Sequence, residues 1–183
     1  MDTSDDRVRV GRRCVLIGLG ALALTWGASP ARAAKKDRAL AFRSIHTGES
    51  LKVVYYADGR YNAEALAEID LIMRDWRTGD VHPIDPRLLD ALYRVRSLLD
   101  SKKPFEIISG YRSPRTNALL ASGSTGVAKR SLHLKGMAAD LNLPGRSLSQ
   151  LRRAAISLRL GGVGYYPRSG FVHLDTGRFR TWS

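Results

Sequence analysis

The chain has 183 residues, of which 44% are hydrophobic, and this is enough for one domain with a core of its own. Its formal charge is +13, yet the basic residues are scattered and form no helix-turn-helix, zinc-finger or RNA-binding aromatic pattern. The scatter of the basic residues and the lack of such motifs therefore argue against a nucleic-acid partner. It favours peripheral contact with an anionic cell-envelope surface, or simply a solvated basic surface.

The first 33 residues have the pattern of an export signal. A polar start ends in the pair Arg12-Arg13, and an apolar run of signal-peptide length follows over residues 14–26. Residues 31–33, Ala-Arg-Ala, offer a cleavage site, and the arginine pair favours the twin-arginine route. An uncleaved anchor is the alternative, although the apolar run is short for a membrane-spanning helix. Export would place the protein in the periplasm. Cleavage after Ala33 would also remove Cys14, the single cysteine of the chain.

A short basic linker is predicted over residues 34–39, followed by one folded domain over residues 40–183. Two strands are expected at the start of this domain, around residues 41–47 and 51–57, with a glycine turn between them. His46 in the first strand is expected to be structural or exposed, because no residue of ligand type surrounds it.

Two amphipathic helices are predicted next. Asn62 caps the first, over residues 63–77, in which apolar residues including Trp76 recur at helical spacing and are expected in the core. The dipeptide Asp85-Pro86 begins the second, which extends to about Ser101 with its leucines inward. Both helices are expected to pack as one layer against a sheet.

A short strand over residues 105–109 leads into a further helix, which Ser113 caps and Pro114 begins. This places Arg112 at the end of a strand, where functional residues commonly gather. Its guanidinium is suited to stabilise the oxyanion that forms when water attacks a carbonyl, or to pair with a carboxylate of a ligand. A surface salt bridge is the alternative role.

The stretch over residues 121–130 is rich in small residues and glycine, which predicts a flexible loop beside a site. Further on, a capping box begins a helix over residues 148–160, and a hairpin follows with strands at 163–166 and 171–175. One of the hairpin tyrosines, Tyr165 or Tyr166, is expected to line the groove above the site. Core packing explains the other equally well.

Two stretches, residues 131–143 and 170–176, carry candidate metal ligands. His133 precedes Asp140 by seven positions, with Gly136 between them where the backbone bends sharply or passes close to another segment. Because side chains alternate along a strand, pairing the two stretches as strands brings Asp140 beside His173. His133, just before the first strand, would then complete a triangle of three candidate ligands. Two imidazoles and a carboxylate match a catalytic zinc site with one open position. A structural histidine or a capping aspartate is the commoner role for any one of them alone.

Four segments resemble the murein endopeptidase K-like branch of the D-alanyl-D-alanine metallopeptidases, which share one zinc fold with lysostaphin-type enzymes and the hedgehog signalling domain. They are residues 108–114, 131–144, 161–167 and 171–182, and the resemblance covers essentially all of residues 39–183. It implies an α+β fold with helices packed on a central antiparallel sheet. It also implies Zn²⁺ bound by His133, Asp140 and His173, a catalytic role for Arg112, and hydrolysis of peptide cross-links in peptidoglycan.

The chain departs from this family pattern at the general base. Many relatives place a histidine two positions before the last metal ligand, or a glutamate three before it, but Phe171 and Gly170 occupy these positions here. Asp175, on the same strand face as His173, is the remaining candidate for the base or for a partner that orients His173.

Three hypotheses therefore stay open for a chain that is expected to be a monomer. The first is a zinc endopeptidase that cuts peptidoglycan cross-links. The second is a D,D- or L,D-carboxypeptidase that trims free peptide tails. The third is a non-catalytic, zinc-containing module that binds peptidoglycan, as the hedgehog domain and the missing base suggest.

Overall fold

The computed structural model describes residues 36–123, 128 and 130–183. The export signal predicted over residues 1–33 lies outside the described residues, and so does the middle of the loop predicted over residues 121–130. Every helix in the described part of the chain is too short or too polar to cross a lipid bilayer. The described residues belong to one compact unit, which holds all the elements below.

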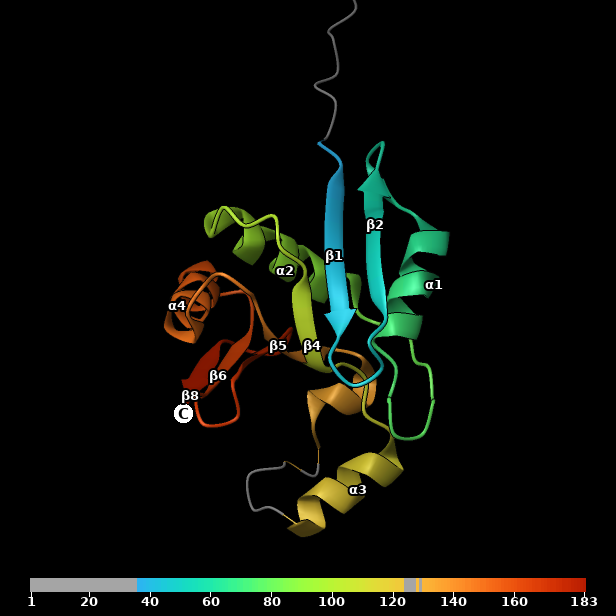
Figure 1. Cartoon of the computed structure of the whole chain (residues 1–183), viewed down its shortest axis with the longest axis vertical. Coiled ribbons are helices and arrows are strands. Elements are labelled where there is room, and N and C mark those ends of the chain that lie inside the picture. Colours follow the sequence, from blue (N-terminus) through green and yellow to red (C-terminus); the bar gives the residue numbers. More distant parts are fainter. Residues whose placement is uncertain (1–35, 124–127, 129) are drawn as a thin grey trace, which may run out of the picture. The chain divides into compact units, whose positions relative to one another are not determined.

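The described residues form helices and a sheet of eight strands, which confirms the α+β class (Figure 1). The strands are β1 Arg38–Ser44, β2 Ser50–Ala57, β3 Arg60–Tyr61, β4 Phe105–Ser109, β5 Ala138–Asn142, β6 Gly162–Tyr166, β7 Phe171–Asp175 and β8 Arg180–Trp182. The α-helices are α1 Ala63–Ile72, α2 Pro86–Leu98, α3 Pro114–Gly123 and α4 Leu148–Leu158, and η1 Leu132–Lys135 is a 3₁₀ helix. The strand order is β3-β2-β1-β4-β5-β7-β6-β8.

The sheet is mixed, which corrects the expectation of a wholly antiparallel one. β1 pairs with β4 in parallel, and β6 pairs with β8 in parallel. The chain leaves β1 through a hairpin to β2 and comes back through α1 and α2, so it enters β4 from the same end as β1. β3 and β8 were not predicted, because strands of two and three residues are too short to show a hydrophobic period.

The first strand begins earlier than the predicted boundary. Arg38 and Ala39 pair with β2 and so belong to the sheet, not to the linker predicted over residues 34–39. The Arg38 guanidinium also forms an ion pair of 2.6 Å with Asp90 on α2, which ties the start of the strand to a helix. The folded domain therefore starts at the latest at Arg38.

The core lies between one face of the sheet and helices α1, α2 and α4. α1 packs on β2, α2 on β1 and α4, and α4 on β6 and β7. Ala139 and Leu141 of β5 and Val172 of β7 are fully buried in this core. Because neighbours along a strand point to opposite faces, Asp140 and His173, which alternate with them, face away from these helices.

Three helix starts follow the prediction from the sequence. The Asn62 side chain accepts hydrogen bonds from the first turn of α1, and the Asp85 side chain does the same for α2, where Pro86 is the first helical residue. Ser147 and Gln150 form the predicted capping box of α4. Each such cap contributes about 1 kcal/mol to helix stability, so these starts are set by local chemistry.

α1 ends at Ile72 rather than at the predicted residue 77. The reason lies in a distant segment, because the carbonyl of Met73 accepts a hydrogen bond of 2.7 Å from the backbone N–H of Tyr111. The chain turns away there, and Trp76, predicted as a core residue of this helix, is instead 38% exposed. The position of Trp76 was therefore predicted wrongly.

Candidate metal centre

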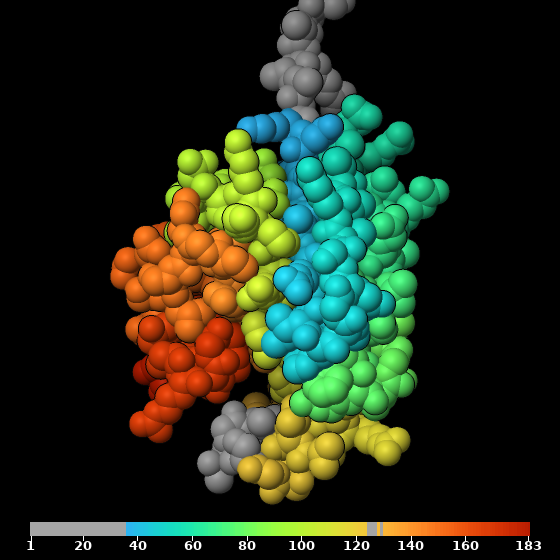
Figure 2. Space-filling view, in the orientation of Figure 1, coloured from blue at the N-terminus to red at the C-terminus, as the bar shows by residue number. Residues whose placement is uncertain are grey.

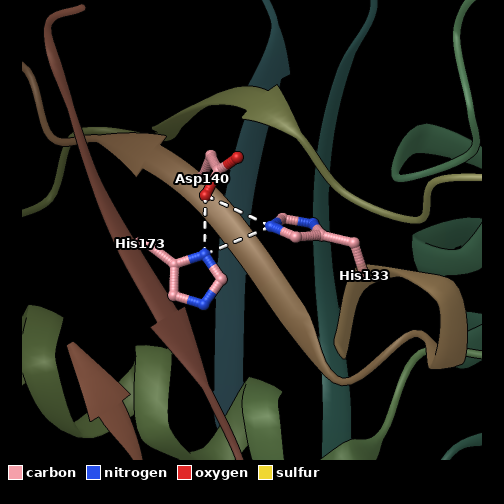
Figure 3. A group of neighbouring side chains, drawn as sticks. All are labelled: His133, Asp140 and His173. Atoms are coloured by element: carbon pink, nitrogen blue, oxygen red, sulfur yellow. Dashed lines mark hydrogen bonds and ion pairs between the residues drawn. The ribbon is translucent and has the colours of Figure 1, made fainter. Parts of the chain in front are cut away.

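Three side chains from three elements meet on the sheet face opposite the helical core (Figure 3). η1 carries His133, and the antiparallel pair β5 and β7 places Asp140 directly opposite His173, as the strand pattern predicts. His173 Nδ1 lies 2.8 Å from Asp140 Oδ1. His133 Nε2 lies 3.2 Å from the same oxygen and 3.2 Å from His173 Nδ1. All three residues are buried.

The size of this triangle suits a tetrahedral metal ion. Ligand atoms at zinc–nitrogen and zinc–oxygen bond lengths of about 2.0–2.1 Å around such an ion lie roughly 3.3 Å apart. The three donor atoms are separated by 2.8, 3.2 and 3.2 Å, which is close to one face of that tetrahedron. Two nitrogens and a carboxylate oxygen are also a donor set that zinc accepts.

The second nitrogen of each imidazole is held by a hydrogen bond on its far side. His133 Nδ1 donates to the Gly110 carbonyl at 2.7 Å, and His173 Nε2 donates to Asp175 Oδ2 at 3.0 Å. In the neutral imidazoles, His133 Nε2 and His173 Nδ1 therefore turn lone pairs toward the Asp140 carboxylate. Three acceptors aimed at one point cannot satisfy one another, and a cation is the group that fits between them.

A proton can take the place of that cation. Burial lowers the pKa of His173, but its hydrogen bonds to Asp140 and Asp175 outweigh burial and raise the pKa to about 8. Burial raises the pKa of Asp140, yet the charge of His133 and the hydrogen bonds from both imidazoles hold that pKa far below its ordinary value. The carboxylate therefore stays ionised, and the cluster retains negative charge for a cation.

Asp175 is enclosed by donors. Its carboxylate accepts hydrogen bonds from His173, from the Arg180 guanidinium at 2.7 Å, and from the backbone N–H groups of Gly162 and Gly177. Burial raises its pKa, but these donors outweigh burial and hold the pKa well below the ordinary range. Of the two roles that the sequence suggested, this geometry favours the partner that orients His173 over the general base.

Arg112 lies beside the triangle, as predicted. Its Nη2 donates to Asp140 Oδ2 at 3.2 Å and to Ser109 Oγ at 3.4 Å, and the residue is 9% exposed. Its buried Nε has no hydrogen-bond partner among the described residues. Burial lowers the pKa of the guanidinium, and the Asp140 carboxylate opposes this. The guanidinium is therefore held beside the triangle by Asp140 and Ser109.

The turn that carries Arg112 is fixed to the segment after α1. The buried carboxylate of Asp75 accepts the backbone N–H of Ser113 at 2.9 Å through Oδ2 and that of Arg77 at 3.0 Å through Oδ1. At Gly110, a Cβ would collide with the backbone of Met73, so only glycine fits. The turn therefore sits at a fixed position over the sheet.

Gly136 ends η1 in the left-handed conformation, with φ of 64°. A Cβ there would also collide with the Pro83 carbonyl, which agrees with the close approach predicted from the sequence. Gly136→Ala is expected to lower the free energy of unfolding by about 2 kcal/mol more than Gly145→Ala, because strain at positive φ affects both but the collision affects only the first.

Gly145 is the matched control, since its φ is 81° and nothing lies within 4 Å of its added Cβ. Urea denaturation of the two variants and the parent measures the difference. Equal losses of stability in the two variants would contradict the collision at Gly136.

The triangle opens into a cavity of about 700 Å³, which is within the usual range of ligand-binding pockets. Figure 2 shows the surface hollowed between the C-terminal segment and α3. Tyr166, Phe171 and Trp182 line it, and Trp182 Nε1 donates to the Tyr166 hydroxyl at 2.8 Å. Tyr165 packs against the core instead, so the groove tyrosine is Tyr166.

Another part of the cavity lining was missed from the sequence. His46 is exposed, as predicted, but it lines the cavity together with Arg77. Neither has a local pattern that would indicate this, because only the fold brings the β1–β2 turn beside the segment after α1. Asp140 is the only carboxylate among the described residues that line the cavity, so a carboxylate general base is absent from that part of the lining.

Comparison with known proteins gives consistent matches. The family model described as peptidoglycan L,D-endopeptidase MepK matches residues 32–182. Peptidoglycan L,D-endopeptidase MepK of Escherichia coli (strain K12) is 46% identical over 182 residues, which cover 97% of this chain and 100% of that protein. The probable peptidoglycan L,D-endopeptidase MepK of Haemophilus influenzae is 45% identical over 148 residues, which cover 80% of each chain. A solved structure, L-Ala D-Glu endopeptidase ChiX of Serratia marcescens, matches 52% of this chain and 68% of that chain at 20% identity, with a TM-score of 0.35.

Proposed function

The chain belongs to the peptidoglycan L,D-endopeptidase MepK family, and from this premise we propose that it is a zinc-dependent enzyme that hydrolyses peptide cross-links of peptidoglycan. The observation that carries the zinc assignment is the triangle of His133 Nε2, Asp140 Oδ1 and His173 Nδ1. The names of the curated relatives support an endopeptidase over the carboxypeptidase and the non-catalytic module that the sequence left open. They also support a scissile bond between an L and a D centre.

In this proposal, His133, Asp140 and His173 would hold the metal beside the cavity. Zn²⁺ bound there would supply Lewis-acid activation of the peptide carbonyl and of the attacking water. Arg112 donates to the carbonyl oxygen as negative charge develops on it, since its guanidinium is fixed beside Asp140. Asp175 keeps the proton of His173 on Nε2 and leaves Nδ1 free for the metal.

The site of action follows from the substrate. We propose that residues 1–33 direct export and that the folded domain acts in the periplasm, where peptidoglycan lies. Cleavage after Ala33 and the twin-arginine route stay predictions, because the signal lies outside the described residues.

Digestion of purified sacculi tests the proposed function. The zinc-loaded protein is expected to convert cross-linked muropeptide dimers into monomers, and a chelator should stop the conversion until zinc is restored. Mass spectrometry separates the hypotheses, because a carboxypeptidase would release single amino acids from free tails. Retention on sacculi without any change in the muropeptides would instead support the binding module.

Metal binding is expected to release a proton below about pH 8, because the ion and the proton compete for His173 Nδ1. The raised pKa means that the proton stabilises the metal-free fold fully below about pH 6.5, and that this contribution is lost as the pH rises through about 8. Zinc titrations in buffers of different ionisation enthalpy should give about one proton per ion from His173 near pH 6.5. Zinc binding without proton release at pH 6.5 would contradict this competition.

Asp175→Asn is expected to weaken zinc binding by about 10- to 100-fold, because an amide does not hold the His173 tautomer as a carboxylate does. Competition with a chromogenic chelator measures the affinity. The exposed Asp58, whose left-handed backbone also suits asparagine, gives the control Asp58→Asn. Unchanged zinc affinity in Asp175→Asn would remove the orienting role.

A further inference from the structure

A stack of three side chains, His46, Trp76 and Arg77, stands beside the metal centre and has no part in the mechanism above. The imidazole of His46 lies flat on the indole of Trp76, with centroids 4.0 Å apart and planes at 17°. The Arg77 guanidinium carbon lies 4.0 Å from the centroid of the same indole. We call this group the His46–Trp76–Arg77 stack.

The stack is anchored at both ends. His46 Nε2 lies 3.1 Å from the Ile108 carbonyl oxygen on β4, and the backbone N–H of Arg77 donates to the buried Asp75 carboxylate. Stacking on Trp76 restricts the guanidinium to fewer orientations than a free arginine side chain samples. A group fixed in advance loses less entropy when it binds a ligand, so this arrangement suits recognition.

Arg77 shares one cavity with Arg112 and the triangle. Among the described residues, no carboxylate lies within ion-pair distance of the Arg77 side chain. Both guanidinium groups are cationic and line the same cavity, so they repel each other across it. An anion that entered between them would relieve this repulsion.

The remaining charges of the cavity lining do not supply that anion. Asp140 is the only carboxylate among the described lining residues, and its two oxygens already face the imidazoles and Arg112. Arg180, which also lines the cavity, is paired with Asp175, and Arg130 adds a further positive charge to the lining. The cavity therefore keeps an excess of positive charge on the side of Arg77.

We propose that the His46–Trp76–Arg77 stack recognises a free carboxylate of the substrate peptide, with Arg77 as the residue that contacts it. Trp76 and His46 are positioning residues that hold the guanidinium plane for two parallel hydrogen bonds to the carboxylate oxygens. The inference rests on the proposed function and adds the class of substrate, which is a peptide with a free carboxylate near the scissile bond.

Binding and cleavage are measured separately on the zinc-loaded full chain. Calorimetry follows binding of the product, an uncross-linked muropeptide, either with free carboxylates or with these converted to amides. The parent protein should bind the free acid about 10- to 100-fold more tightly than the amide. Arg77→Gln should lose most of this preference by weakening binding of the acid, with binding of the amide unchanged. Arg153→Gln, at an exposed arginine of α4, is the control.

Two further variants test the positioning role. Trp76→Phe, which keeps an aromatic face, should retain most of the preference for the acid, whereas Trp76→Leu should lose most of it. Equal weakening of acid and amide by Arg77→Gln, or no weakening of either, would overturn the inference. Parent protein that binds the products but cleaves no dimer would contradict the proposed function instead, and the binding comparison would still decide the role of Arg77.

Discussion

Replacing His133 by alanine is expected to abolish zinc binding and to lower kcat/KM for muropeptide dimers by at least about 1,000-fold. The imidazole supplies one of three donor atoms that lie within 3.2 Å of one another, so its loss opens one side of the metal site. Without the ion, the peptide carbonyl and the attacking water lose their activation together. Metal analysis of the purified variant and a dimer digest measure the two effects.

The control for this variant is His82→Gln. His82 also lies near a turn and stacks on Tyr111 at 4.7 Å, but it is not one of the cavity-lining residues. The His82→Gln variant should keep zinc content and activity close to those of the parent. Hydrolysis that survived both His133→Ala and a chelator would exclude the metallopeptidase mechanism.

Arg112→Gln is expected to lower kcat by about 100- to 1,000-fold, the range for removal of one oxyanion donor. Zinc content should stay unchanged, because Arg112 contacts Asp140 through Oδ2, whereas Oδ1 faces the imidazoles. Steady-state kinetics and metal analysis on one preparation separate loss of chemistry from loss of the ion.

The kinetic parameters also separate the two roles that the sequence left open for Arg112. A loss in kcat with little change in KM indicates contact with the developing oxyanion. A rise in KM with nearly unchanged kcat would indicate that Arg112 binds a substrate carboxylate in the ground state. Arg112→Lys keeps the charge but not the fork of donors, so it should restore only part of the lost activity.

The centre of the site could be predicted from the sequence because it obeys the simplest rule of strand geometry. Alternation along β5 and β7 places Asp140 and His173 on the same face, and the observed register pairs them directly. The tight turn at Gly136 could likewise be predicted, since glycine is the residue that adopts positive φ most readily. Where one strand or one turn determines a feature, the sequence was a sufficient guide.

The surroundings of the site could not be predicted, because distant segments determine them. α1 stops at Ile72 since Tyr111 takes the next carbonyl, and no residue near Trp76 indicates this. β8 is set by its parallel pairing with β6 and places Trp182 over His173, with ring centroids 5.2 Å apart. Hydrophobic periodicity predicts neither contact, so it predicted neither the end of α1 nor the lining of the cavity correctly.

One buried carboxylate, that of Asp75, connects the backbone segments that carry Arg112 and Arg77. Asp75 holds the backbone of Ser113, next to Arg112, with one oxygen and the backbone of Arg77 with the other. The backbone segments that carry the oxyanion donor and the proposed carboxylate contact therefore share one anchor. Loss of that single carboxylate would disturb both ends of the proposed peptide site together.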